Sequence, residues 1–318
     1  MKVVNVHTHF VTSDYIAAIV KAGKDKEDGF PMPTKYSLEE NLKVMDEAGI
    51  DMSILSLSTP HPHFGDDAEA CDLNRSINEQ TKAWVDQYPE RFGWMATLPL
   101  PDVEGSIKEA IYSLDVLKAD GIRLSSSSRG VYLGDPLLDP LFEELNKHKA
   151  VIIIHPCRPE AVPGGCFTAG PMPLFEYLAD TTRTVINLIT SGAMDRYPDI
   201  KIIVPHSGSF LPSVAYRLAS ISEVLIPAGL MKPCDVMGAV GKFYWDISGD
   251  ALPHSLPILM NISTPDRCMY GLDYPHTPPN IVIRKTKLLK EALQNSSEYG
   301  KYADDMMGGT ALKLLGKK

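Results

Sequence analysis

The feature that most constrains the fold is an alternation between short apolar runs and longer segments with helical spacing. Eight runs rich in β-branched and other apolar residues recur along the chain, and near-continuous runs of this kind predict buried strands. The runs lie at residues 3–9, 52–58, 92–98, 121–126, 150–155, 201–206, 242–248 and 268–274.

The segments between these runs carry apolar residues three and four positions apart, as amphipathic helices do. Clear examples are residues 37–49, 68–88, 104–121 and 139–150, several of which end at a glycine or before a proline. Buried strands that alternate with helices form a parallel sheet covered on its faces, and eight such units favour closure into a (β/α)8 TIM barrel. An open doubly wound sheet is the main alternative.

No composition shift, linker or short repeat marks a boundary, so we expect residues 1–318 to form one α/β barrel domain. There is no Gly-rich dinucleotide turn after the first strand and no P-loop. Two stretches, 11–36 and 156–173, are long for connections in such a barrel, and we expect them to shape the mouth of a pocket.

Charge and cysteine usage narrow the class of partner. The formal net charge of -9 disfavours nucleic acid or an anionic membrane, which leaves a small molecule as the expected ligand. The five cysteines are scattered and odd in number, which argues against a disulfide framework or a zinc ribbon. The chain starts directly on its first predicted strand and has no apolar run of membrane-spanning length, so we expect a cytoplasmic protein.

Polar residues end several of the predicted strands, where a barrel of this kind carries its chemistry. His7 and His9 end the first strand, His155 the fifth and Asp273 the eighth, while His206 follows the sixth. Alternate residues of a strand point to the same side, so these groups can converge inside the barrel. Three imidazoles and a carboxylate suit one Zn²⁺ ion, with Mn²⁺ or Mg²⁺ as alternatives.

A single histidine at a strand end is more often structural than metal-binding, and the prediction rests on several strands agreeing. His276 could contact a metal ligand or the substrate, but it could equally be a surface residue. Cys157 follows a proline after the fifth strand, which favours a packing role. The other histidines are expected to be solvated or structural, although His63 could reach the pocket: His61, His63, His148 and His254.

The motifs HTH at the first strand, IIIHP at the fifth, PHSG at the sixth and GLDYP at the eighth resemble the amidohydrolase superfamily. The likeness is greatest to its branch of metal-dependent decarboxylases, which includes the aminocarboxymuconate semialdehyde, γ-resorcylate and 6-methylsalicylate enzymes. It extends through most of the chain, and the stretch from TTRT to HSGS is most similar to the 6-methylsalicylate type.

This resemblance implies roles for individual residues. His7, His9, His155 and Asp273 would bind the metal, and His206 would be the catalytic histidine beside it. The fourth strand ends in serines and lacks the lysine that other amidohydrolases carboxylate, which favours a single metal ion.

Two further positions bear on substrate and assembly. Asn41 stands where the aminocarboxymuconate enzyme has a substrate-binding arginine, so that substrate is not expected. Arg217 matches an arginine that in relatives reaches the substrate of a neighbouring subunit, which implies a homodimer or higher homo-oligomer, although a surface arginine is an equally plain interpretation.

The expected activity is non-oxidative decarboxylation of a small aromatic or enol carboxylic acid, such as a hydroxybenzoate. The metal would stabilise the developing negative charge, and either His206 or a protonated Asp273 would deliver the proton that replaces CO₂. A hydrolase of amides, esters or lactones with the same ligands is the first alternative, and a binding protein with a structural metal is the second.

Overall fold

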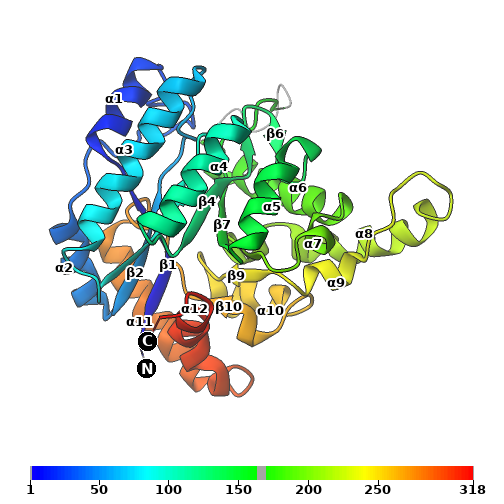
Figure 1. The fold of residues 1–318 in the computed structure, drawn as a ribbon. Helices are drawn as coiled ribbons and strands as arrows, with labels where there is room; N and C mark the ends of the chain where they lie inside the picture. Colours follow the sequence, from blue (N-terminus) through cyan, green and yellow to red (C-terminus); the bar gives the residue numbers. More distant parts are fainter. Residues whose placement is uncertain (1, 163–169, 318) are drawn as a thin grey trace.

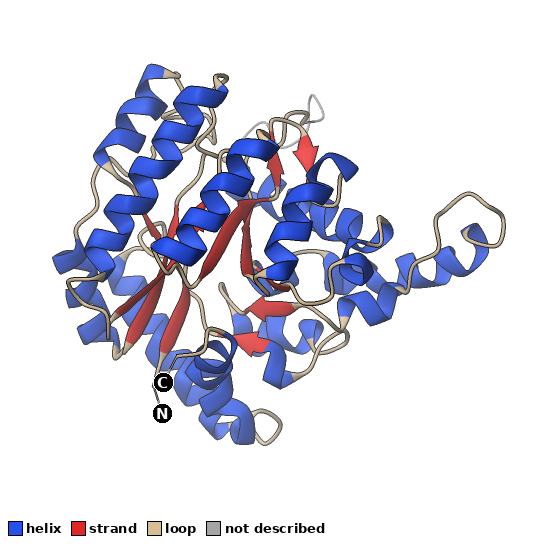
Figure 2. Ribbon diagram, in the orientation of Figure 1, coloured by secondary structure: helices blue, strands red, loops and turns tan. Residues whose placement is uncertain are grey.

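The computed structural model describes residues 2–162 and 170–317. Its centre is one parallel sheet of eight strands, and helices surround it on the outside (Figures 1 and 2). The sheet has the order β1-β2-β3-β4-β7-β8-β9-β10. These strands are β1 Val4–Phe10, β2 Met52–Leu57, β3 Phe92–Thr97, β4 Gly121–Ser125, β7 Val151–His155, β8 Lys201–Val204, β9 Tyr244–Asp246 and β10 Cys268–Met269.

Each of the eight predicted apolar runs overlaps one strand of this sheet, and each of the four predicted helical segments overlaps a helix, although β1 begins and ends one residue later than predicted and α3 and α4 begin one residue earlier. The helices are α1 Ser13–Lys21, α2 Leu38–Ala48, α3 Asp67–Val85, α4 Val103–Ile111, α5 Asp139–Lys147, α6 Glu176–Thr190, α7 Ala193–Arg196, α8 Leu211–Leu225, α9 Val236–Val240, α10 Leu256–Leu259, α11 Pro279–Asn295 and α12 Thr310–Leu314.

The first and last strands meet, which closes the sheet into a barrel. The Val6 amide donates to the Tyr270 carbonyl at 3.0 Å, and the His9 amide donates to the Tyr274 carbonyl at 2.6 Å. A parallel bridge joins Thr8 to Tyr274. The prediction of a (β/α)8 barrel is confirmed, and the open doubly wound alternative is wrong because such a sheet keeps two free edges.

The lower part of the barrel interior, towards the amino ends of the strands, is apolar. Side chains two residues apart on a strand share a side, and here they form a separate buried cluster. Its members are Val4, Val6, Met52, Ile54, Met95, Val151, Ile153, Ile203, Met269 and Ala311. Ala311 comes from α12, which closes the bottom of the barrel close to the chain termini (Figure 1).

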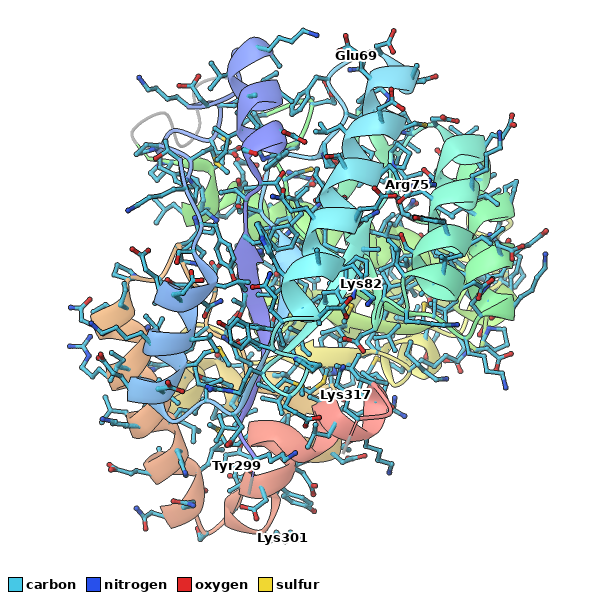
Figure 3. All side chains as sticks on the ribbon, turned by 60° about the vertical axis from the view of Figure 1, so that its left-hand side comes forward. Glu69, Arg75, Lys82, Tyr299, Lys301 and Lys317 are labelled. Atoms are coloured by element: carbon cyan, nitrogen blue, oxygen red, sulfur yellow. The ribbon has the colours of Figure 1, made fainter. Side chains whose placement is uncertain are left out.

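The surrounding helices are amphipathic, and α3 illustrates the pattern. Its inner face buries Ala70, Ile77 and Val85, while charged residues occupy its outer face. Figure 3 labels Glu69 and Arg75 along this helix, and the Arg75 Nε atom donates to a Glu109 carboxylate oxygen on α4 at 2.8 Å. The larger core therefore lies between the sheet and these inner helix faces.

The structure adds a helix in a stretch that the sequence interpretation treated as a loop, and a hairpin that it did not identify. The stretch 11–36 contains α1, which begins at an N-cap where the Thr12 side chain accepts from the Tyr15 amide and which buries Tyr15 and Ile19, four residues apart. After β4, the short strands β5 Ser127–Ser128 and β6 Val131–Tyr132 form an antiparallel hairpin. Residues 163–169 of the second long stretch lie outside the described residues.

None of the helices in residues 2–162 and 170–317 combines the length and the apolar character needed to cross a bilayer. The cytoplasmic location stays a prediction.

Candidate metal centre and active site

Four of the side chains selected from the sequence meet at the upper end of the barrel. His7 and His9 come from β1, His155 from the end of β7, and Asp273 from the segment after β10. One ligand atom from each lies within 4.8 Å of the others. The Nε2 atoms of His7 and His9 are 3.0 Å apart, and the Asp273 Oδ1 atom lies 3.1 Å from His9 Nε2 and 3.6 Å from His7 Nε2.

The opposite nitrogen of each imidazole faces a hydrogen-bond acceptor. His7 Nδ1 lies 2.8 Å from Asp246 Oδ2, His9 Nδ1 lies 3.3 Å from the Ser56 carbonyl, and His155 Nδ1 lies 2.8 Å from the Pro156 carbonyl. A proton held on Nδ1 leaves the Nε2 lone pair free for a metal, and such outer contacts are the usual companions of metal-binding histidines.

The donor set and its spacing fit a divalent ion. Two ligands of a tetrahedral ion with bonds of ~2.1 Å lie about 3.4 Å apart. The separations of 3.0, 3.1 and 3.6 Å among the His7, His9 and Asp273 atoms are close to this value. The Asp273 Oδ1 atom is buried and has no hydrogen-bond partner among the described residues. A bound cation would be the missing partner of this oxygen. The arrangement also puts two imidazole nitrogens face to face, which is favourable when a cation lies between them.

Electrostatics keep His9 and His155 in the neutral state that a metal requires. Burial alone would lower the pKa of His7, but the Asp246 and Asp273 carboxylates outweigh it and raise that pKa. Burial lowers the pKa of His9 to about 4, and burial together with the neighbouring imidazoles lowers the pKa of His155. Burial alone would raise the pKa of Asp246, but the charge and hydrogen bond of His7 outweigh it and lower the pKa to about 2. At neutral pH, His9 and His155 are therefore neutral imidazoles that can donate a lone pair to a metal, and Asp246 is an anion that orients His7.

Backbone strain marks the two segments that supply Asp273 and His206. Asp273 has a φ of 59°, and His206, Ser207 and Ser209 have φ values of 55°, 52° and 56°, in the left-handed region that residues other than glycine seldom adopt. The Asp273 amide donates to the His7 carbonyl at 2.9 Å, which fixes this residue against β1. Strain of this kind persists where the surrounding structure imposes it, commonly at functional sites.

His206 lies beside the cluster rather than within it. Its ring centroid is 5.2 Å from that of His7 and 6.2 Å from that of His155. Its amide donates to Asp246 Oδ1 at 3.1 Å, so Asp246 holds both His7 and the His206 backbone. The His206 Nδ1 atom is buried and has no partner in the described part of the chain.

A cavity of about 410 Å³ opens above the cluster, a volume suited to a small molecule. His155, His206 and Asp273 lie at its polar side, together with His276. His276 Nε2 lies 2.9 Å from the Ser58 Oγ atom, and its side chain lines the cavity rather than a solvent-exposed loop. A contact between His276 and a substrate stays a prediction.

The apolar side of the cavity comes from the two long stretches predicted to form its mouth. Phe30 belongs to the first, and Pro171 and Pro173 belong to the region that follows β7. Phe30 also stands edge-on to His276, with ring centroids 5.6 Å apart. A substrate with an apolar ring would contact these residues while its polar groups faced the histidines.

The remaining histidines have structural or surface positions, as expected. His61 Nε2 bonds to the Leu100 carbonyl at 2.6 Å, and His63 Nε2 lies 2.9 Å from Asp67 Oδ1. His148 contacts Glu144 and Asp115, and His254 is exposed. Cys157 is buried, and its thiol donates to the Ser127 carbonyl at 3.0 Å, away from the cluster.

Two residues named from the resemblance lie away from this cavity within the chain. Arg217 is exposed on α8, a helix that extends outward from the barrel (Figure 1). Asn41 is buried on α2, where its side-chain amide donates to the Tyr36 hydroxyl at 2.9 Å.

The sequence interpretation missed Asp246 and Tyr177. Asp246 ends β9, so the strand-end rule that selected the histidines would have found it had carboxylates on the seventh run been considered. Tyr177 lies on α6 and lines the cavity, and no strand-end pattern points to a residue on a helix.

The chain matches the amidohydrolase family over residues 4–317. It is 33% identical over 302 residues to decarboxylase yanB of Aspergillus niger, covering 90% of this chain and 81% of that one. It is 30% identical over 319 residues to 6-methylsalicylic acid decarboxylase of Penicillium expansum, covering 99% and 96% respectively.

Solved structures agree with this assignment. A crystallised amidohydrolase II is 32% identical, with a TM-score of 0.91 and coverage of 99% of this chain and 100% of that one. A dihydroxybenzoic acid decarboxylase from Polaromonas, with bound manganese, is 21% identical, with a TM-score of 0.82 and coverage of 99% and 97%. The second likeness concerns the fold.

Proposed function

This chain belongs to the amidohydrolase family, and we propose that it is a metal-dependent, non-oxidative carboxy-lyase acting on a small aromatic or enol carboxylic acid, such as a hydroxybenzoate. Relatives of 30% and 33% identity that cover nearly all of the chain bear decarboxylase names, which supports this activity over the hydrolase alternative. The structural observation that carries the proposal is the convergence of four donor atoms at the base of the cavity.

His7, His9, His155 and Asp273 would hold one divalent ion. When bound, the ion would supply charge stabilisation for the substrate oxygens and for the electrons left on the ring carbon. Three imidazoles and one carboxylate favour Zn²⁺, and the manganese in the Polaromonas structure makes Mn²⁺ the alternative to test.

The chain's own residues would orient the acid and supply the proton. The bond between the ring and the carboxylate carbon breaks, CO₂ leaves, and the ring carbon takes up one proton. His206 lines the cavity and has a buried Nδ1 atom without a partner among the described residues, so we assign the proton transfer to it. Asp273 serves as a ligand, because His7 and His9 outweigh the effect of burial and lower its pKa well below the usual range.

Metal analysis and a product screen test the proposal together. The purified protein should contain about one divalent ion per chain and release CO₂ from at least one member of a panel of hydroxybenzoates and related acids. Chelation should abolish CO₂ release, and added Zn²⁺ or Mn²⁺ should restore it. Turnover of ester, amide or lactone substrates without any CO₂ release would overturn the carboxy-lyase assignment in favour of a hydrolase.

We further propose that the protein works as a homodimer or higher homo-oligomer built on α8. Figure 1 shows that α8 and the segment after it extend away from the barrel. This arm exposes large apolar side chains, with Tyr216 57%, Val224 69% and Leu230 76% accessible. Arg217 lies on the same arm, which supports a position facing a second copy of the chain.

Light scattering after size-exclusion chromatography would measure the assembly of the wild type and of a Val224→Glu variant. The wild type should run as a dimer or larger species, and the charged side chain should shift it towards the monomer. Arg217→Ala should reduce turnover if this arginine reaches a partner's substrate. A wild-type monomer, or a fully active and fully assembled Arg217→Ala variant, would contradict this assignment.

A further inference from the structure

The barrel interior contains a cation that none of the assigned roles uses. Arg123 points inward from β4 and is only 1% exposed. Its Nη1 atom donates to the Ser125 Oγ atom at 2.6 Å. It takes part in no ion pair with a carboxylate in residues 2–162 and 170–317, although an arginine stays charged under ordinary conditions.

The unbonded atoms of this guanidinium form a specific edge. Nε and Nη2 are both buried and have no acceptor among the described residues. Their N–H groups point in the same direction on one side of the planar fork, and this is the edge that binds the two oxygens of a carboxylate side by side. A buried charge without a counter-ion is costly, and proteins keep one where a ligand supplies the counter-ion.

Arg123 lies at the level of the metal cluster. Ser125, which accepts its hydrogen bond, pairs with His155 in the ladder between β4 and β7. The Ser125 Oγ atom also lies 3.2 Å from His61 Nδ1, and His155, its partner in the ladder, lines the 410 Å³ cavity. The bond from Nη1 to Ser125 therefore puts the guanidinium at the level of His155, on the neighbouring strand.

A second cavity is lined in part by His61, Ser127 and Cys157. Its volume is about 120 Å³, below the ~300 Å³ at which small-molecule sites usually begin. The cavity with the metal ligands has the volume and the apolar wall that an aromatic acid needs. Arg123 itself lines neither cavity, but His155, which pairs with Ser125, lines the larger one, and we expect a ligand to approach the guanidinium from there.

We propose that Arg123 binds the carboxylate of the aromatic acid through its Nε and Nη2 groups, as a substrate-positioning site separate from the metal ligands. The class of substrate in this inference rests on the proposed function. The test does not, because the site would bind a carboxylate whether or not the metal is present and whether or not CO₂ is released.

The test uses the full chain stripped of metal with a chelator and then desalted. Thermal shift and calorimetric titration would measure binding of benzoate, phenol and 2-hydroxybenzoate. Benzoate and 2-hydroxybenzoate should raise the melting temperature and bind, whereas phenol should do neither, since it lacks the carboxylate. Binding of phenol equal to that of benzoate would overturn the proposal by showing that the ring alone is recognised.

Two substitutions separate recognition from structure. Arg123→Met should weaken benzoate binding by at least about tenfold, the loss expected for a hydrogen bond to a charged group. It should also raise the melting temperature of the ligand-free protein, because an apolar side chain replaces a buried charge that has no counter-ion. Arg123→Lys keeps the charge without the fork and should bind benzoate less tightly than the wild type.

The matched control is Arg129→Met, which removes a positive charge from the lining of the 120 Å³ cavity. It should bind benzoate as the wild type does. Unchanged benzoate affinity in Arg123→Met or Arg123→Lys would overturn the proposal, as would a ligand-free Arg123→Met protein that is less stable than Arg129→Met or does not fold. If no acid releases CO₂ while benzoate binding depends on Arg123, the decarboxylase assignment fails and the carboxylate site stands.

Discussion

The lower and upper halves of the same barrel strands differ in polarity, in the number of buried polar atoms without a partner and in backbone strain. On β1, Val4 and Val6 belong to the apolar interior cluster, while His7 and His9 belong to the candidate metal centre. On β7, Ile153 lies in the apolar cluster and His155 in the metal centre, about 7 Å further along the strand. Packing and chemistry are therefore two residues apart on β7. On β1 they meet at the neighbouring residues Val6 and His7, where the strand pairing shifts register between Asn5 and Thr8.

The upper half retains groups that the protein itself does not satisfy. Buried polar atoms of Asp273, His206 and Arg123 have no partner in the described residues, and two of these residues have positive φ angles. Buried polar groups without partners cost stability, so the apolar lower half must offset that cost. Substitutions in the two halves should therefore have opposite signatures. Those in the upper half should change metal content and turnover, and those in the lower half should change the free energy of unfolding.

The largest effect is expected at the metal ligands. His7→Ala removes one imidazole of the cluster, so the protein should lose bound metal and CO₂ release together while remaining folded. Mass spectrometry of metal content, the CO₂ assay and circular dichroism measure the three quantities. A variant that retained one ion per chain would show that His7 is not a ligand.

His206→Asn should distinguish the role of a metal ligand from that of a proton-transfer group in the upper half. Asparagine keeps a polar side chain but does not titrate, so turnover should fall by about 10²- to 10⁴-fold while the metal stays. Loss of the metal would make His206 a ligand, and unchanged turnover would make it structural.

The lower half should respond in the opposite way. Ile153→Ala leaves a cavity in the apolar cluster and should reduce the free energy of unfolding by about 2–5 kcal/mol, as measured by urea denaturation. Metal content and turnover per folded molecule should stay close to those of the wild type. Ile258→Ala, at a half-exposed position on α10, is the matched control and should change stability little. A loss of metal in Ile153→Ala would show that the two halves are coupled.

The smallest effect is expected at Asp246, which contacts the proposed metal ligand His7. Asp246→Asn keeps the Oδ1 acceptor for the His206 and Ser248 amides but replaces the carboxylate oxygen that faces His7 Nδ1. Metal affinity or turnover should fall by about 10- to 100-fold, measured by competition with a chromophoric chelator. Asp250→Asn removes a nearby exposed carboxylate as a control, and an equal effect there would rule out a specific role for Asp246.

The sequence predicted the sheet well because its signal is local. All eight runs that became strands are short, apolar and bounded by helical spacing, and burial on both sides leaves no other pattern for a parallel strand. The four converging side chains could be predicted for the same reason. They end or follow strands that must meet at one end of a barrel: His7, His9, His155 and Asp273.

The rest of the site depends on features that strand spacing does not encode. The role of Asp246 requires knowing that β9 ends level with His7, and Tyr177 reaches the cavity from α6. Arg123 could have been placed inside the barrel from its alternation with Gly121 and Ser125, but its lack of a carboxylate partner needed the positions of distant residues. The left-handed conformation of Asp273 has no signal in the sequence.

The contact between β1 and the segment after β10 has a consequence for the order of events during synthesis. His7 and His9 are made long before Asp273 and before Tyr274, which forms the bridge to Thr8. Strands β1 to β9 can pair as they emerge, but the four proposed ligands come together only after the segment that follows β10 has been made. Metal loading would then have to wait for this segment, and a chain that ends before it would not bind the ion at this site.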